Sequence, residues 1–420
     1  MEMPVEDRRV LLAEGPLPKF LRYVRIETTA DPAAADVPSS PGQWRLLGLL
    51  EAEARSMGLQ DVRLDRHGIL TATLAACGAS ATAPAVGLLA HVDTSPAVSG
   101  AGVAPIVHRA YDGGVLRLPG GGVLDPERHP ALREVVGHDL VTSDGRTLLG
   151  ADDKAGVAEI MALAARLLRE PQAPRARLRL GFTPDEEIGR GIGYFDLEGF
   201  GADVAYTLDG GALGDISWEN FHAQNLTVVV RGRSAHTGSA KGYMVNALAI
   251  AAALIALAPA TERPETTCGR EGFIHFDALD GSVERAELTV LLRDFDAAGL
   301  EARRAWLESA CGRLRAEHPG CGIEVRQTGG YRNMRDAVQR RPEAVRLALE
   351  AMRRAGVEPR PSLIRGGTDG ARLSALGLPT PNLFAGGMDF HSLTEWISAR
   401  WMEQAVDVLA ALAGLWAQEG

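Results

Sequence analysis

The run LRLGFTPDEE at residues 178–187 joins an apolar segment to three consecutive acidic residues. Residues 178–183 have the short, apolar pattern of a buried strand, and Pro184 marks the end of that strand. In open α/β sheets, the carboxyl ends of the strands line the binding crevice. We therefore expect the carboxylates of Glu186 and Glu187 to lie at the edge of the sheet where a substrate binds.

The segments around this run predict more strands of the same kind, separated by helices. Each strand is short, apolar and followed by a polar residue suited to chemistry, whereas the helices are longer and amphipathic or apolar. Strands that alternate with helices predict a doubly wound α/β domain with a mostly parallel sheet. The expected elements are strands at 85–90 and 204–208 and helices at 42–59 and 157–168.

The order of elements changes between about residues 222 and 330. We expect strand 225–231, helix 243–258, strands 272–278 and 286–293, helix 298–316 and strand 322–328. This β-α-β-β-α-β order is that of an inserted ferredoxin-like α+β domain. The first pattern then returns, with helix 342–355, strands 361–365 and 381–384, and helix 399–417. The predicted domains are a catalytic domain of residues 1–221 plus 332–420 and a lid or dimerisation domain of residues 222–331.

Length and composition restrict the class of protein. A chain of 420 residues is long for one core, which agrees with two domains. The formal net charge of -10 argues against nucleic acid or an anionic membrane as a partner. No apolar stretch is long enough to span a bilayer, and the N-terminus carries acidic residues where a signal peptide needs positive charge, so we expect a cytoplasmic protein. The four cysteines form no C-x-x-C pair, so a metal would need histidine and carboxylate ligands.

Polar residues at strand ends and helix starts form the candidate site. Zinc accepts nitrogen and oxygen ligands of these types. Taken singly, each residue could be a solvated strand end, a helix cap or a packing histidine. Carboxylates gathered at one edge repel each other unless cations neutralise them, so the set as a whole indicates a metal site. The residues are His91, Asp93, Asp152, Glu186, Glu187, Asp209 and His391.

Motifs along nearly the whole chain are similar to those of the peptidase T family of tripeptide aminopeptidases, within the zinc-dependent aminopeptidase and deacylase superfamily. The first three mark the superfamily, and the second and the last are more specific to peptidase T. The matching runs are HVDTSP at 91–96, TLLGADDKAG at 147–156, FTPDEE at 182–187, YTLDGG at 206–211, AKGYMVNA at 240–247 and RGGTDGA at 365–371.

The resemblance implies two zinc ions per subunit. Asp152 would bridge them, His91 and Asp209 would complete the first site, and Glu187 and His391 would complete the second. Cobalt or manganese would fit the same ligands.

The resemblance also implies which residues act on the substrate. Asp93 would orient an imidazole ligand from behind, as metal-bound histidines commonly require. Glu186 would be the general base that takes a proton from the attacking water and passes it to the departing amine. The expected reaction is hydrolysis of the N-terminal peptide bond of short peptides, chiefly tripeptides.

Three residues of the inserted domain or near it are candidates for substrate binding. His236, in SAHTG at 234–238, corresponds to a lid histidine near the substrate carbonyl. Arg293 and Arg365 correspond to basic residues suited to the free carboxylate of a peptide, which a guanidinium binds through two parallel hydrogen bonds. Arg293 could instead form a surface ion pair with Asp294 or Asp296.

Two runs depart from the peptidase T pattern and leave the side-chain preference open. Residues 386–392 read GGMDFHS where the family has a Tyr-Asn-Tyr-His-Gly type of run, although an acidic residue still follows four positions after the histidine. The run around His236 lacks the usual proline. The alternative hypotheses are a related dipeptidase, carboxypeptidase or N-acyl amino acid deacylase, and a non-catalytic peptide- or metal-binding protein. A homodimer formed through the lid domain is a further expectation.

Overall fold

The computed structural model describes residues 6–419, which divide into two compact units. Unit 1 comprises the described residues up to Trp218, residues 336–362 and those from Thr368 onward; unit 2 comprises Glu219–Arg335 and Leu363–Gly367. The sequence placed the insertion at 222–331 and did not include 363–367. This short segment belongs to unit 2 because its backbone and side chains bond there, for example through the Phe221 N–H to the carbonyl of Ile364 at 3.2 Å.

An eight-stranded sheet in the order β1-β2-β8-β3-β9-β16-β10-β15 forms the centre of unit 1. Its middle strands β8, β3, β9 and β16 run parallel, whereas β1, β2 and β10 pair antiparallel with their neighbours. The predicted α/β fold with a mostly parallel core is confirmed. The strands are β1 (Gln60–Leu64), β2 (Leu70–Leu74), β3 (Val86–His91), β8 (Leu178–Thr183), β9 (Val204–Gly210), β10 (Asp215–Asn220), β15 (Arg360–Ile364) and β16 (Asn382–Phe384).

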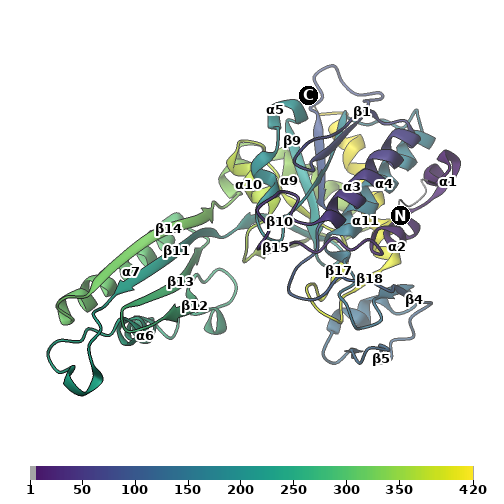
Figure 1. Cartoon of the computed structure of the whole chain (residues 1–420). Coiled ribbons are helices and arrows are strands. Elements are labelled where there is room, and N and C mark those ends of the chain that lie inside the picture. Colours follow the sequence, from purple (N-terminus) through teal and green to yellow (C-terminus); the bar gives the residue numbers. More distant parts are fainter. Residues whose placement is uncertain (1–5, 420) are drawn as a thin grey trace. The chain divides into compact units, whose positions relative to one another are not determined.

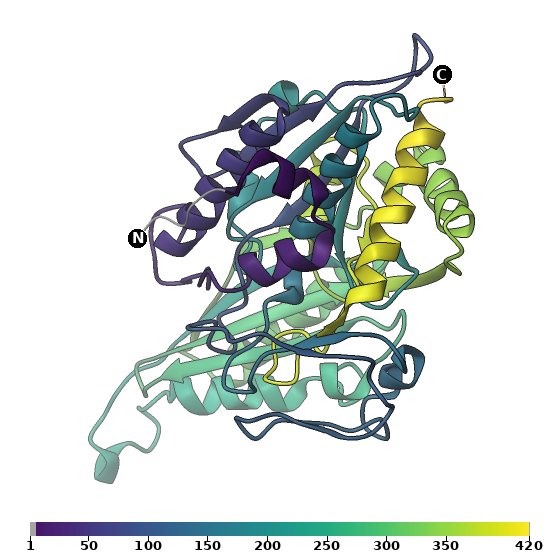
Figure 2. The ribbon, with the colours of Figure 1, turned by 90° about the vertical axis from the view of Figure 1, so that its right-hand side faces the viewer.

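Helices cover both faces of this sheet (Figure 1). On one face α4 packs against β3 and β9, and α11 lies beside α4, as Figure 2 shows in blue and yellow. Apolar side chains of these helices and strands form the largest core. The helices of this face are α1 (Arg8–Ala13), α2 (Pro16–Tyr23), α3 (Pro41–Met57), α4 (Ala151–Arg169), α9 (Glu343–Arg354) and α11 (Ala399–Trp416). A smaller core on the other face includes Phe200 and Leu373, from α5 (Leu197–Phe200) and α10 (Asp369–Ala375). The remaining helix, α8 (Arg335–Gln339), begins at the boundary between the units.

A small antiparallel sheet, which the sequence analysis did not predict, lies beside the main one in unit 1. Its order is β17-β18-β7-β4, and a separate pair, β5-β6, completes this region. These strands are too short to show the alternation of apolar and polar residues that predicts a strand. They are β4 (Ile106–His108), β5 (Leu116–Arg117), β6 (Val123–Leu124), β7 (Leu140–Thr142), β17 (Gly387–Met388) and β18 (Trp396–Ser398).

Unit 2 is a four-stranded antiparallel sheet in the order β12-β13-β11-β14 with two helices packed on it. This is the ferredoxin-like arrangement that the sequence predicts. Its elements are β11 (His222–Arg231), α6 (Ala247–Leu257), β12 (Phe273–Gly281), β13 (Arg285–Asp294), α7 (Ala297–Glu317) and β14 (Gly322–Tyr331). Across residues 6–419, no helix combines the length and the apolar character that a bilayer-crossing segment needs.

Candidate metal centre

The register of three neighbouring strands brings the predicted ligands to one edge of the sheet. In the β3–β8 pair His91 lies opposite Thr183, and in the β3–β9 pair Leu89 lies opposite Thr207. Asp209, two residues after Thr207, is therefore level with His91, and the acidic turn after β8 begins at the same edge. The strand pairing thus places residues from three distant segments side by side.

Two groups of ligand atoms gather here and share Asp152, at the start of α4. In the first group, His91 Nε2 lies 2.9 Å from Asp152 Oδ1 and 3.6 Å from Asp209 Oδ1. In the second, His391 Nε2 lies 3.1 Å from Asp152 Oδ2 and 2.8 Å from Glu187 Oε1. Within each group, the ligand atoms all lie within 4.8 Å of one another. Each oxygen of Asp152 faces a different histidine, which is the geometry of a bridging carboxylate.

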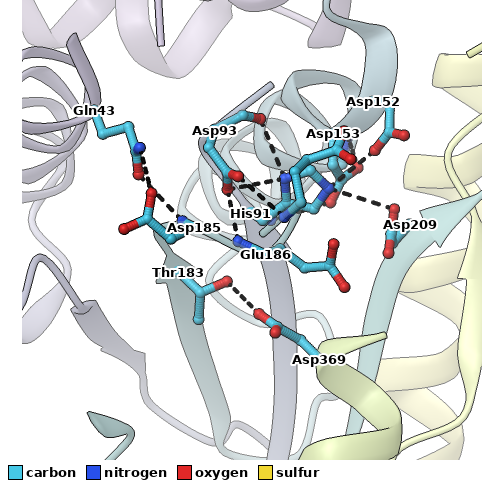
Figure 3. A network of polar contacts seen from close by, with 12 residues as sticks. Gln43, His91, Asp93, Asp152, Asp153, Thr183, Asp185, Glu186, Asp209 and Asp369 are labelled. Carbon is cyan, nitrogen blue, oxygen red and sulfur yellow. Dashed lines mark hydrogen bonds and ion pairs between the residues drawn. The ribbon is translucent and has the colours of Figure 1, made fainter. Parts of the chain in front are cut away.

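Asp93 contacts the rear of the His91 ring. Its Oδ1 lies 3.3 Å from His91 Nδ1, opposite to Nε2, which faces the carboxylates (Figure 3). The same buried carboxylate accepts the backbone N–H groups of Glu186 at 3.0 Å and Glu187 at 3.1 Å. His91 Nδ1 also lies 3.2 Å from the backbone carbonyl oxygen of Asp93, its hydrogen-bond partner. A histidine whose Nδ1–H donates to an oxygen acceptor presents the Nε2 lone pair to a metal. The first group is therefore oriented for metal binding.

The electrostatics of the site also fit divalent cations. Burial raises the pKa of Asp209 to about 7 and also raises that of Glu187. A hydrogen bond to Asp152 and the nearby carboxylate of Glu187 raise the pKa of His391 to about 10. Without a metal, therefore, protons balance part of the carboxylate charge. Glu187 Oε1 is buried and, among the described residues, no donor satisfies it in hydrogen-bond geometry. These histidine and carboxylate ligands suit zinc. Cations bound in place of the protons would satisfy Glu187 Oε1 and neutralise the negative charge of the cluster.

Glu186 belongs to neither ligand group, yet its carboxylate points into the same space, between those of Asp209 and Asp369 (Figure 3). Burial raises the pKa of Glu186 well above its ordinary value, and the charges of Asp369 and Asp209 raise it further. Asp369 is itself buried and accepts a hydrogen bond from Thr183 Oγ1 at 2.8 Å. A carboxyl group with raised proton affinity beside two candidate metal positions is suited to general-base chemistry.

Comparison with known proteins identifies the family. Residues 138–414 match the family model described as peptidase family M20/M25/M40. Peptidase T of Salmonella enteritidis PT4 is 46% identical over 406 residues, which cover 96% of this chain and 99% of that protein. The chain belongs to peptidase family M20/M25/M40. The predicted relationship to peptidase T is confirmed, and with it the predicted class of enzyme, a metal-dependent aminopeptidase.

Two solved structures share the fold of this chain. Aminopeptidase PepT from Bacillus cereus superposes with a TM-score of 0.73 at 22% identity, covering 96% of this chain and 98% of that chain. A tripeptidase from Staphylococcus aureus gives a TM-score of 0.75 at 20% identity, covering 98% of this chain and 99% of that chain. At these identities the superpositions show that the fold is shared over both units.

The three candidate substrate-binding residues of this M20/M25/M40 peptidase belong to unit 2, whereas the ligand set belongs to unit 1. His236 is exposed, and its Nδ1 accepts the Gly238 N–H at 3.2 Å. Arg293 donates to the carbonyl of Leu292 at 3.0 Å and lies over the Tyr331 ring. The surface ion pair considered for Arg293 is not among the described contacts, because Asp294 pairs with Arg303 instead.

Arg365 is half-buried and extensively bonded within unit 2. Its Nη1 donates to the carbonyls of Gly269 and Glu271, each at 2.8 Å, and Nη2 donates to Thr267 Oγ1 at 2.9 Å. The guanidinium also lies over the Phe221 ring, 4.9 Å from its centroid. In this structure Arg365 therefore fixes the loop at 267–271, a role that the sequence did not indicate.

A buried network beneath the acidic turn was also missed. Asp185 has a positive φ of 55° and is fully buried. Its carboxylate accepts the Ser39 N–H at 2.7 Å. It also accepts the Gln43 side-chain amide at 2.7 Å, which ties the turn to the start of α3 (Figure 3). The sequence did not indicate this contact, because a serine and a glutamine carry no signal of a partner far away along the chain.

Proposed function

We propose that this M20/M25/M40 peptidase removes the N-terminal residue of short peptides, chiefly tripeptides, with two zinc ions held by the two ligand groups. The observation that carries the proposal is that Asp152 faces both His91 and His391, with the unliganded Glu186 beside them. Cobalt and manganese suit the same ligands, and metal analysis of the protein isolated from its source cells identifies the ion that it carries. The peptidase T relative, at 46% identity, supports the substrate class.

The roles of the residues follow from their contacts. Held one in each ligand group, zinc ions would lower the pKa of a water molecule and polarise the scissile carbonyl. Glu186 would take the proton from the attacking water and deliver it to the departing amine. Asp93 keeps the His91 ring and the Glu186 backbone in place during this transfer. Water must reach Glu186, whose side chain follows the end of β8 and is only partly buried.

Unit 2 supplies the substrate-binding residues in this proposal. The exposed imidazole of His236 is suited to stabilise the oxyanion that forms on the carbonyl oxygen. Arg365 and Arg293 are suited to bind the free carboxylate of a tripeptide. Arg365 can bind the carboxylate only through N–H groups that are not bonded to the loop at 267–271, or after that loop moves.

A panel of free and blocked peptides tests the function. Di-, tri- and tetrapeptides with free, N-acetylated or amidated ends are incubated with purified enzyme, with and without a chelator. Release of the first residue, fastest from free tripeptides and abolished by the chelator, supports the proposal. Release of the last residue would indicate a carboxypeptidase, removal of the acetyl group a deacylase, and hydrolysis of dipeptides alone a dipeptidase. Binding of the tripeptide without turnover would indicate a non-catalytic binding protein.

Two expectations from the sequence stay predictions within this proposal. A cytoplasmic location is checked by fractionation of the source cells. Pairing of two copies through unit 2 is checked by analytical ultracentrifugation of the intact protein, and a monomer at all concentrations would contradict it.

A further inference from the structure

The carboxylate of Glu395 is buried beneath the metal centre and accepts three backbone hydrogen bonds. Its Oε2 accepts from Leu149 at 2.7 Å and Gly150 at 2.8 Å, and its Oε1 accepts from Asp152 at 3.1 Å. The side chain is 1% exposed. All three donors belong to the segment that carries the shared ligand Asp152. A single side chain therefore holds the backbone from which the bridging carboxylate projects.

Glu395 also belongs to the loop that carries the second histidine. Residues 389–395 connect β17 to β18, and these strands pair through Met388 and Trp396. His391 has a positive φ of 58°, so its position depends on contacts that hold this loop in an uncommon backbone conformation. Glu395 is the last residue of the loop, and its three hydrogen bonds fix that end of the loop to the Asp152 segment.

The two loops start from neighbouring strands. β18 pairs with β7, with Ile397 opposite Val141, and the chain that leaves β7 leads through residues 143–150 to Asp152. The pairing of β18 with β7 joins the segment of His391 to the segment of Asp152. The hydrogen bonds of Glu395 join the same two segments a second time, next to the ligands. Because the segments are joined at two points, the distance between His391 and Asp152 is defined even though both project from loops.

A carboxylate suits this position better than its amide. Both oxygens of a carboxylate accept hydrogen bonds, whereas a glutamine offers one oxygen and an NH2 group that donates. In Glu395→Gln, either the Asp152 N–H or the Leu149 and Gly150 N–H groups would face another donor. The hydrogen bonds lost would be those of the segment that carries Asp152, because every hydrogen-bond partner of the Glu395 carboxylate lies there.

We propose that Glu395 is a positioning residue that sets the spacing of Asp152 and His391 and thereby the affinity of the metal position formed by Asp152, Glu187 and His391. The proposal rests on the proposed two-metal function. It assigns Glu395 no contact with substrate or metal; it acts through the backbone of Asp152 and through the loop of His391.

Zinc titration of the metal-stripped protein, by competition with a chromophoric chelator, tests this. In Glu395→Gln the zinc affinity of the position that includes His391 is expected to fall about 10- to 100-fold, the size typical for loss of a residue that supports a ligand, and that of the position that includes His91, which shares Asp152 but not the His391 loop, is expected to fall less. The matched control is Glu159→Gln, which removes an equally buried carboxyl group from α4 whose oxygens have no hydrogen-bond partner among the described residues. Both affinities of this control are expected to remain unchanged.

A second variant shows through which ligand Glu395 acts. In a His391→Ala background, where the second position is already lost, Glu395→Gln should have little further effect on zinc binding. Wild-type affinities at both positions in folded Glu395→Gln would overturn the proposal. Equal loss at both positions, together with a lower unfolding temperature of the metal-free protein, would show a merely structural role and would also overturn it.

A substitute variant and an activity assay at high zinc concentration complete the test. If Glu395→Gln does not fold, Glu395→Asp, which keeps the charge and shortens the side chain by one methylene, is titrated against the same predictions. Activity of Glu395→Gln should recover at high zinc concentration, because the defect lies in occupancy of one position. If the wild type binds fewer than two zinc ions, the proposed function fails; if it binds two and Glu395→Gln binds both as tightly, only the role of Glu395 fails.

Discussion

The buried carboxylate of Asp93 accepts a hydrogen bond from the backbone N–H of Glu186 at 3.0 Å while its Oδ1 lies 3.3 Å from His91 Nδ1. One side chain thus orients a metal ligand and also holds the turn that carries the general base. This contact joins the end of β3 to the end of β8, two strands that are parallel neighbours in the sheet. A shift of Asp93 would therefore move both the metal ligand His91 and the general base Glu186.

Replacing Asp93 should affect both functions. In Asp93→Asn one acceptor oxygen becomes an NH2 group that faces either an N–H of the turn or the His91 ring. We expect zinc affinity to fall about 10- to 100-fold and kcat to fall even when zinc is saturating. Isothermal titration and steady-state kinetics measure the two effects. The exposed Asp31→Asn serves as the control, and normal kcat at saturating zinc in Asp93→Asn would contradict the double role.

Glu186→Gln should separate chemistry from metal binding. The amide cannot accept the proton of the attacking water, so kcat is expected to fall by about 10²- to 10⁴-fold. Because Glu186 belongs to neither ligand group, the variant should still bind two zinc ions. Stopped-assay kinetics and metal analysis of the dialysed protein check this. Loss of a metal together with the activity would instead make Glu186 a ligand.

Glu159 should make the stability of the protein depend on pH. This carboxyl group in α4 is fully buried, and burial raises its pKa well above the ordinary 4.5. Above pH 4.5 the unfolded chain loses this proton while the folded protein retains it, so this group makes the folded state less stable as pH rises. Glu159→Gln removes that dependence. Its free energy of unfolding, relative to the wild type, should therefore increase between pH 5 and pH 8 in urea titrations, and a difference independent of pH would contradict the raised pKa.

Arg365→Ala tests the binding of the substrate carboxylate. If the guanidinium binds that group, KM for a free tripeptide should rise about 10- to 100-fold, as expected for a charge-assisted hydrogen bond, while zinc content stays the same. The amidated tripeptide is the matched control and should be affected far less. Equal losses for both substrates, with faster hydrogen exchange in residues 267–271, would show that Arg365 serves only the loop.

The central strands and the candidate ligands could be predicted from the sequence because both follow from local pattern. The strand predicted at 178–183 matches β8, and the predicted inserted domain has the expected order of elements. Polar residues directly after apolar strands pointed to His91, Glu187 and Asp209, since parallel strands end at one edge. The structure places these side chains together.

The contacts of two other supporting residues, Glu395 and Asp185, could not be predicted, because their partners lie far away in the sequence. Glu395 bonds to a segment about 245 residues earlier, and Asp185 bonds to Ser39 and Gln43, more than 140 residues earlier. The strands of the small sheet were missed for another reason, since two or three residues carry no period. The loop held by Arg365 depends on backbone carbonyls, which every residue has and no sequence motif marks.

Diffraction from zinc-soaked crystals, recorded on both sides of the zinc absorption edge, tests the central claim most directly. The account predicts two anomalous peaks that share Asp152, one also bound by His91 and Asp209 and the other by Glu187 and His391, with Glu186 bound to neither. A single peak, or a second zinc ion held by residues outside this set, would contradict it.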